Sequence, residues 1–257
     1  MYDWSPLLEE FHIWRDLGLT LPLWWRDDDA ITPTPELARL DALSKSLEIP
    51  VHLAVIPNQV QTDLAPFVRA APNLRAITHG WTHRNYEQRP TKSSEFGPSR
   101  SADEARREIL AGAKIIRAQF GASALPIFAP AWNRFFLDHA PILAEAGYSA
   151  LSLYKPRVWQ MAAPGVELIN THVDPIEWRG SRKLCPPGEI IAKTVKLLRD
   201  RRMGYTDARE PLGYLTHHLD HTEDIWHFSE HFLTVLREGP TRLATFSPTP
   251  DVKDAVS

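Results

Sequence analysis

The sequence LWWRDDD at residues 23–29 joins an apolar run directly to three adjacent carboxylates. About fifty residues later, the sequence HGWTH at residues 79–83 supplies two histidines that are four positions apart. Two imidazoles and one carboxylate can hold a divalent metal and leave positions open for water, and a second aspartate can take that water's proton. These residue types therefore predict a metal-dependent hydrolase.

Both motifs also have a purely structural interpretation. The aspartates could form a solvated turn before the helix that Pro35 begins, and a single histidine is usually structural. Three adjacent carboxylates repel one another, however, and would be costly at a partly buried strand end without a cation. Two histidines at ligand spacing after another predicted strand add to that argument. The functional interpretation is therefore favoured.

The composition limits the classes of protein to consider. With 257 residues and 43% hydrophobic content, we expect one domain over residues 1–257. The net charge of -3 gives no basic field for nucleic acid, and no apolar run approaches the roughly 18 residues that a membrane span needs. Cys185 has no cysteine partner, and the first residues lack the pattern of a secretion signal, so a cytoplasmic location is expected.

Strand-like and helix-like patterns alternate along the chain, which predicts an α/β fold of parallel strands with crossover helices, in seven or eight units. Strands are expected at 21–25, 51–56, 74–78, 126–129, 150–153, 166–170, 212–216 and 243–246. Helices are expected after Ser5 and Pro35, from the capping box at 101–104 to Gly121, and at 136–147, 188–202 and 222–238. The polar motifs follow strands, at the end where parallel sheets carry active sites.

In motif order, the chain resembles the polysaccharide deacetylase family, which includes nodulation-type chitooligosaccharide deacetylases, and in detail a divergent bacterial subgroup of it. The resemblance implies a distorted (β/α)7–8 barrel. It also implies that Asp27 is the catalytic base and that Asp28, His79 and His83 hold the metal. The neighbouring Asp29 stays open as the ligand. Zinc is the expected metal, although iron, cobalt, nickel and manganese suit the same ligands.

The third family motif is an Arg-Pro-Pro-aromatic turn, which is similar to residues 128–134, FAPAWNR. In the family, the arginine orients the base and the backbone helps to stabilise the oxyanion, a role that falls here near Trp132. Ala129 replaces the arginine. Arg26 or Arg134 could supply the guanidinium instead.

The remaining motifs supply an acid. Leu215-Thr216-His217 matches the family's strand that ends in the catalytic histidine, with His218 as the alternative if the register slips by one. Glu177-Trp178 is similar to the motif that supports this histidine, and Asp174 could do the same. Besides the catalytic residues, we expect side chains at four positions to contact substrate: Trp81, Trp178, Leu215 and Arg134.

The resemblance implies hydrolysis of a carbon–nitrogen amide bond, most simply removal of an N-acyl group from an amino sugar or a related small intracellular substrate. Two alternatives stay open. The same scaffold could open a cyclic amide, as allantoinase-like relatives do, or it could be a non-catalytic carbohydrate-binding module.

Overall fold

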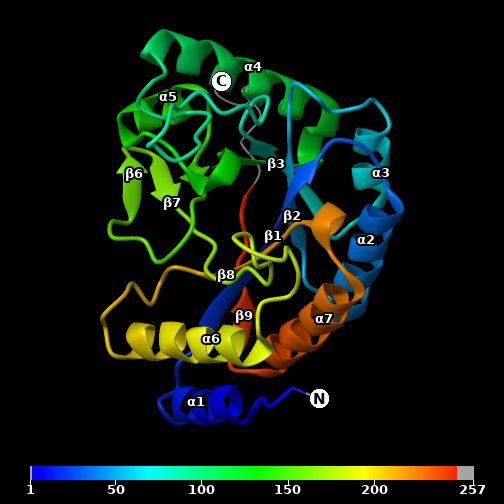
Figure 1. The fold of residues 1–257 in the computed structure, drawn as a ribbon, viewed down its shortest axis with the longest axis vertical. Helices are drawn as coiled ribbons and strands as arrows, with labels where there is room; N and C mark the ends of the chain where they lie inside the picture. Colours follow the sequence, from blue (N-terminus) through cyan, green and yellow to red (C-terminus); the bar gives the residue numbers. More distant parts are fainter. Residues whose placement is uncertain (1, 248–257) are drawn as a thin grey trace, which may run out of the picture.

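The computed structural model describes residues 2–247, and its centre is a nine-stranded sheet (Figure 1). The strands are β1 (Leu21–Ala30), β2 (Val51–Val55), β3 (Leu74–His79), β4 (Ala124–Ala129), β5 (Ala150–Leu151), β6 (Met161–Ala163), β7 (Val166–Leu168), β8 (Leu212–Thr216) and β9 (Thr241–Leu243). Their order is β6-β7-β5-β4-β3-β2-β1-β8, and β9 pairs with β1. All pairs are parallel except β6 with β7.

An irregular segment brings the two ends of the sheet together. The segment that follows β7 runs alongside β8. Val173 pairs there with Tyr214, and the amide of Leu215 donates to the carbonyl of Val173 at 2.8 Å. The same segment still bonds to the chain beyond β5, because the Thr171 amide donates to the Leu153 carbonyl. The sheet therefore curls into a distorted barrel, and the predicted α/β fold class is confirmed.

Helices surround the sheet (Figure 1). They are α1 (Ser5–Asp16), α2 (Pro35–Leu47), α3 (Leu64–Ala70), α4 (Ala102–Phe120), α5 (Ala140–Glu145), α6 (Pro187–Arg202) and α7 (Glu223–Glu238). Local sequence explains two of their starts. The Thr34 hydroxyl accepts from the Leu37 amide, and Ser101 with Glu104 forms the predicted capping box.

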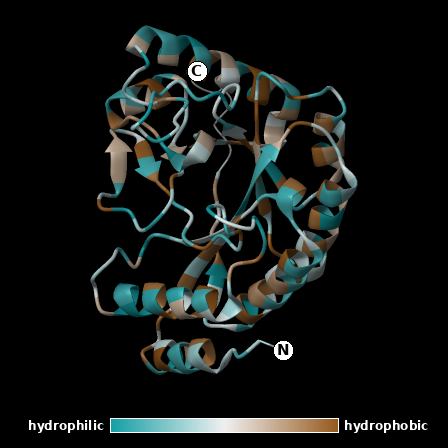
Figure 2. Ribbon diagram, viewed as in Figure 1, coloured by the Kyte–Doolittle hydropathy of each residue, from teal (hydrophilic) through white to brown (hydrophobic). Residues whose placement is uncertain are grey.

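Alternation along β1 divides its side chains between two environments. Trp24 lies in a small apolar cluster with residues of β2, β3 and β4, whereas Trp25 lies in the large cluster under the helices. A Cβ at residue 213 would lie 2.5 Å from Trp24 Nε1, so Gly213 permits this close packing. Figure 2 shows hydrophilic colour at the end of β1, where the aspartates lie.

The structure differs from the sequence prediction mainly at element ends and in short elements. Strand β1 continues through the aspartates to Ala30 instead of ending at residue 25. Helix α3 was not predicted, because it has seven residues and contains Pro66. Strand β6, which forms an antiparallel pair with β7, was also missed, and β9 begins two residues before its predicted start.

No helix within residues 2–247 combines the length and apolar character that crossing a membrane requires.

Candidate metal centre and catalytic cleft

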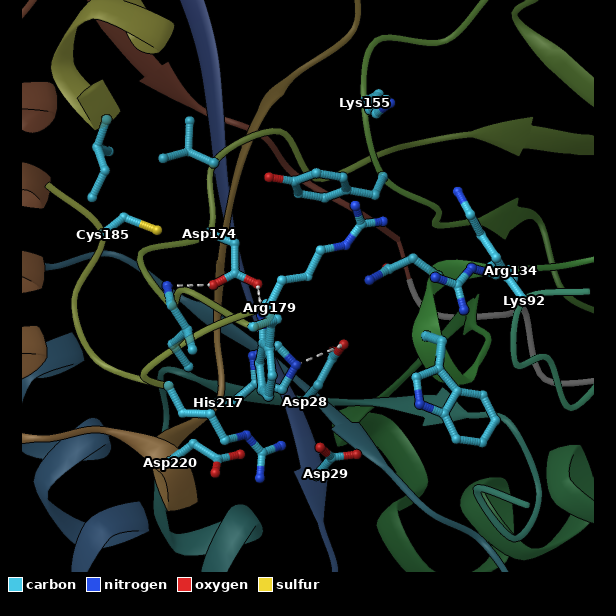
Figure 3. Close-up of a pocket in the computed structure, with 18 of the residues that line it drawn as sticks. Asp28, Asp29, Lys92, Arg134, Lys155, Asp174, Arg179, Cys185, His217 and Asp220 are labelled. Atoms are coloured by element: carbon cyan, nitrogen blue, oxygen red, sulfur yellow. Dashed lines mark hydrogen bonds and ion pairs between the residues drawn. The ribbon is translucent and has the colours of Figure 1, made fainter. Parts of the chain in front are cut away.

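A cleft of about 950 Å³ lies at the carboxyl ends of the strands (Figure 3). Asp28 and Asp29 enter it from the end of β1, His79 from the end of β3 and His217 from the residue after β8. Trp132 follows β4 and lines another wall. The sequence prediction that several strand ends converge on one site therefore agrees with the geometry.

Three side chains in this cleft could hold one metal ion. Asp29, His79 and His83 each offer a ligand atom, and these atoms lie within 4.8 Å of one another. Oδ1 of Asp29 is 3.1 Å from Nε2 of His79 and 3.4 Å from Nε2 of His83. One carboxylate and two imidazoles leave positions for water and substrate, as catalytic metal sites require.

Local geometry fits a cation at this position. The Nδ1 atom of His79 is 3.0 Å from the carbonyl oxygen of Ala129, and since a carbonyl can only accept, Nδ1 carries the proton. The lone pair of Nε2 is then free for a metal. Oδ1 of Asp29 is buried and accepts no hydrogen bond from the described residues. A divalent ion would satisfy both atoms.

Electrostatics support the same assignment. Although burial disfavours its charge, the neighbouring His79 lowers the pKa of Asp29, which is therefore ionised at neutral pH. Burial lowers the pKa of His83, which favours the neutral ring that a metal needs, whereas the charges of Asp28 and Asp29 raise the pKa of His79 despite its burial. The same two negative charges would attract a divalent cation. The ring of His83 also packs against Trp132, with centroids 4.5 Å apart, and this contact fixes its position.

The carboxylate grouped with the two histidines is that of Asp29, and not that of Asp28 as the sequence predicted, because both oxygens of Asp28 face Arg26. Oδ1 of Asp28 is 2.9 Å from Nε of the arginine, and Nη2 of the arginine donates to Oδ2 at 2.9 Å. Arg26 is fully buried and is held by the hydroxyl and carbonyl of Ser152 and by the side-chain oxygen of Asn133. Asp28 is therefore a carboxylate clamped beside the candidate metal site.

Asp27, the predicted base, lies outside the cleft. It is fully buried and accepts hydrogen bonds from the Thr216 hydroxyl at 2.6 Å and from the backbone amide of His218 at 3.1 Å. Its Oδ1 is also 2.5 Å from Nδ1 of His218. Despite burial, this contact lowers the pKa of Asp27 and raises the pKa of His218. The two form a buried ion pair.

The strand geometry explains why the aspartate assignments shift by one residue. Side chains alternate along β1, so Arg26 and Asp28 share one face and Asp27 takes the other. Strict alternation would send Asp29 to the face of Asp27. The pairing register changes between Asp27 and Ala30, however, and Asp29 has a φ of 74°. This bulge brings Asp29 into the cleft beside Asp28.

His217 lies in the cleft as predicted, and its Nε2 is 3.9 Å from Oδ2 of Asp28 (Figure 3). The acidic residue near it is Asp174, whose Oδ2 accepts from Nε1 of Trp178 at 2.7 Å. Burial raises the pKa of Asp174, while the nearby His217 acts in the opposite direction. The Trp178 ring packs edge-on to His217 with centroids 4.6 Å apart.

Glu177, predicted to support the acid, does not line the cleft. It is exposed and accepts from the hydroxyl of Ser181 at 2.8 Å. The chain turns between these residues, because the Gly180 and Arg182 amides both donate to the Glu177 carbonyl. Asp174 comes directly after Val173, which is still paired with β8, and this explains its position beside His217.

The predicted substrate-contacting residues divide into two groups. Trp178 and Arg134 line the cleft. Trp81 is not part of its wall and packs instead against the core cluster under α4 and α5, while Leu215 is 1% exposed within β8. We therefore correct the expected roles of Trp81 and Leu215, whose positions suit packing rather than substrate contact.

Sequence reasoning missed three contributors. Asp29 was kept only as an alternative ligand, and the bulge that turns it has no obvious sequence signal. Ser152, which holds Arg26, comes from a predicted strand that no motif marked, and Asn133, which does the same, lies within the third motif but was given no role. Asn133 and Trp132 both have positive φ values, of 57° and 56°, and an asparagine after a Pro-Ala-Trp turn is a weak signal for such a backbone.

A scan against descriptions of known protein families finds no match to this chain, and no curated protein sequence matches it. Solved structures do match. A peptidoglycan N-acetylglucosamine deacetylase has 13% identity and a TM-score of 0.54, with coverage of 88% of this chain and 86% of the other. A cobalt-bound family 4 acetyl xylan esterase from Clostridium thermocellum has 15% identity, a TM-score of 0.50 and 87% coverage of both chains.

A third similar structure is a pseudoenzyme of carbohydrate esterase family 4 from Bacillus anthracis, with 17% identity and a TM-score of 0.55. The match covers 87% of this chain and 64% of that one. These likenesses establish that the chain has the polysaccharide deacetylase fold, as the motif order predicted.

Proposed function

We propose that this chain is a metal-dependent hydrolase of the polysaccharide deacetylase family that cleaves a carbon–nitrogen amide bond, most simply to remove an N-acyl group from an amino sugar or a related molecule. One observation carries the proposal. The candidate metal ligands Asp29, His79 and His83 share a cleft with a clamped carboxylate, Asp28, and a histidine, His217. In the proposed reaction these residues serve as base, acid and metal ligands.

The proposed reaction consumes one water. A bound metal would polarise the carbonyl and lower the pKa of the attacking water. Asp28 accepts a proton from that water as its oxygen bonds to the carbonyl carbon, and His217 gives a proton to the nitrogen as the carbon–nitrogen bond breaks. The products are a carboxylic acid and an amine. The backbone amide of Trp132 is our candidate donor to the oxyanion, because the amides of Asn133 and Arg134 donate to the carbonyls of Pro130 and Ala131 within the turn.

Zinc is our first choice for the metal, because two imidazoles and one carboxylate are a frequent zinc ligand set. The cobalt ion in the similar acetyl xylan esterase supports a divalent metal in this fold. Iron, nickel and manganese also accept such ligands.

Arg26 takes the role that the resemblance gives to the missing arginine at position 129. It reaches Asp28 from two positions earlier on the same strand and grips it at two oxygen atoms. A planar guanidinium fixes a carboxylate in both position and orientation, which an ammonium cannot do. We therefore assign Arg26 as the positioning residue for the base.

For Arg26→Lys we expect kcat to fall roughly 10- to 100-fold, because the single ammonium would let Asp28 move by a fraction of an ångström. KM and metal content should stay the same. The matched control is Arg39→Lys, since Arg39 also grips a carboxylate, Glu223, at two oxygens but does so on the surface. A change in KM alone, or loss of metal, would assign Arg26 a different role.

The acid is tested with two substrates that share an acetyl group, 4-nitroacetanilide and 4-nitrophenyl acetate. In His217→Ala we expect turnover of the amide to fall roughly 10²- to 10⁴-fold, while the ester, which has a good leaving group, loses far less. Metal content serves as the control. Equal losses on both substrates would remove His217 from the acid role.

One comparison favours a second candidate, a non-catalytic module, because a pseudoenzyme shares this fold. The candidate base, acid and metal ligands of this chain argue against it. Metal-loaded protein that hydrolyses no N-acyl or ester substrate would support the non-catalytic alternative instead.

A further inference from the structure

The cleft wall is unusually rich in positive charge for this chain. Six basic side chains line it: Lys92, Arg134, Lys155, Arg179, Arg182 and Lys193. The whole sequence, by contrast, has a formal net charge of -3. A general excess of lysine and arginine therefore does not explain this accumulation.

None of these six cations has a carboxylate oxygen within 4.0 Å among the described residues. Five acidic side chains line the same cleft, but three of them are engaged elsewhere. Asp28 pairs with Arg26, Asp29 lies with the two histidines, and Asp174 accepts from Trp178. Six basic side chains therefore line the cleft against five acidic ones, one of which is already paired with Arg26, and none of the six forms an ion pair within residues 2–247.

Arg134 and Arg179 line the same cleft, and a backbone contact holds Arg134 in position. Nη1 of Arg134 donates to the carbonyl of Ser93 at 2.6 Å, which fixes the guanidinium of this half-buried side chain. Burial and the nearby Arg179 both lower the pKa of Arg134. Because Arg134 and Arg179 both line this cleft, an anion bound between their guanidinium groups would reduce their mutual repulsion. Figure 3 draws both residues, with Lys92 and Lys155, above Asp28 and Asp29.

A second pair faces the same space. The ammonium of Lys193 donates to the hydroxyl of Tyr154 at 2.7 Å. Burial lowers the pKa of Lys193, as does the adjacent Lys155, whereas Asp174 opposes the shift. The positive charge thus extends along the cleft instead of stopping at one residue.

We propose that the substrate of this cleft carries a phosphoryl group, held by Arg134 and Arg179, beside the N-acyl group that reaches the metal site. A phosphate monoester carries a charge of about -1.5 to -2 and three acceptor oxygens, which two guanidinium groups can share. A carboxylate carries a single charge, which would balance only one of these two guanidinium groups. The inference rests on the proposed function, because it describes another part of the same substrate.

Binding and turnover test the proposal separately. Binding of inorganic pyrophosphate to the metal-loaded protein is measured by calorimetry for wild type, for the double variant Arg134→Gln/Arg179→Gln and for Arg107→Gln. Arg107 is an exposed arginine on α4 outside the cleft and forms no ion pair with the described residues, so it is a matched control. Any contribution of the metal is common to all three proteins.

We expect the double variant to bind pyrophosphate at least about tenfold more weakly, and the control to bind like wild type. In turnover, wild type should prefer N-acetylglucosamine 1-phosphate over N-acetylglucosamine by at least about tenfold in kcat/KM, and the double variant should lose most of this preference. For N-acetylmuramic acid, which carries a carboxylate in place of the phosphate, the increase in kcat/KM over N-acetylglucosamine should be smaller.

Three results would contradict the proposal: equal pyrophosphate binding by wild type and double variant, equal turnover of the two glucosamine substrates, or a stronger preference for the carboxylate. Absence of turnover on every substrate would overturn the proposed hydrolysis instead. In that case pyrophosphate binding would still decide whether the two arginines form an anion site.

Discussion

Asp28→Asn is expected to keep its divalent metal while kcat falls by about 10²- to 10⁴-fold, whereas Asp29→Asn is expected to lose the metal. Asparagine has nearly the shape of aspartate, so each substitution removes a charge and a proton acceptor with little change in packing. Asp29 lies with His79 and His83 at the candidate metal site, whereas both carboxylate oxygens of Asp28 contact Arg26. Asp28→Asn should therefore impair turnover, and Asp29→Asn should impair metal binding.

Elemental analysis of protein purified without chelators measures the metal, and initial rates on an N-acyl substrate measure turnover. His79→Ala is the positive control for metal loss, because its Nε2 points at the same site. Circular dichroism shows whether each variant is folded, which matters for Asp28→Asn because Arg26 stays buried without its partner. Metal loss in Asp28→Asn with full loading in Asp29→Asn would return the ligand role to Asp28.

Asp27→Asn is expected to keep metal but to destabilise the fold by about 3–5 kcal/mol, because it breaks a fully buried ion pair with His218. Chemical denaturation at fixed pH measures this loss. The control is Asp41→Asn, which removes an i,i+4 pair with the half-exposed Lys45 and should cost about 0.5 kcal/mol. A metal-free but stable Asp27→Asn protein would place Asp27 in the site instead.

The same pair gives a pH signature with a defined sign. The pKa of His218 is raised in the folded protein. Its contribution to folding stability is therefore complete at pH values below the unfolded pKa of about 6.5, and it is lost as pH rises through the folded pKa. The pKa of Asp27 is lowered in the folded protein, so its contribution is complete above the unfolded value of about 3.8 and is lost as pH falls through the lower folded value. The stability difference between wild type and Asp27→Asn should therefore shrink above neutral pH.

Much of this architecture could be predicted because it depends on local patterns. The helix that begins after Thr34 and the capping box at Ser101 are short-range signals, and the structure has both. The end of β1 could not be predicted in the same way. Three adjacent aspartates suggest a turn, but here they continue the strand. The partner of Asp27 is His218, which is distant in the sequence, and the partner of Asp28 is Arg26, two positions earlier.

The candidate site shows the same division between local and long-range information. His79 and His83 were recognisable from their spacing alone, and the structure brings them together. The choice among three adjacent aspartates depends on a one-residue bulge, and the choice between Asp174 and Glu177 depends on where the chain leaves β8. A one-residue shift in a strand moves a side chain to the opposite face, so an error of one position changes every role.

The position of Arg26 has a consequence for how activity is judged from alignments. A comparison made column by column finds alanine where the resemblance leads one to expect arginine, and it would class this chain as degenerate. In space the guanidinium is present, two residues before the carboxylate that it grips. The proposed base and its proposed orienting group are therefore encoded in one tripeptide, Arg26-Asp27-Asp28, and could be inherited or transplanted as a unit. Loss of a residue from a motif is not loss of its function when a neighbouring strand position supplies the same chemical group.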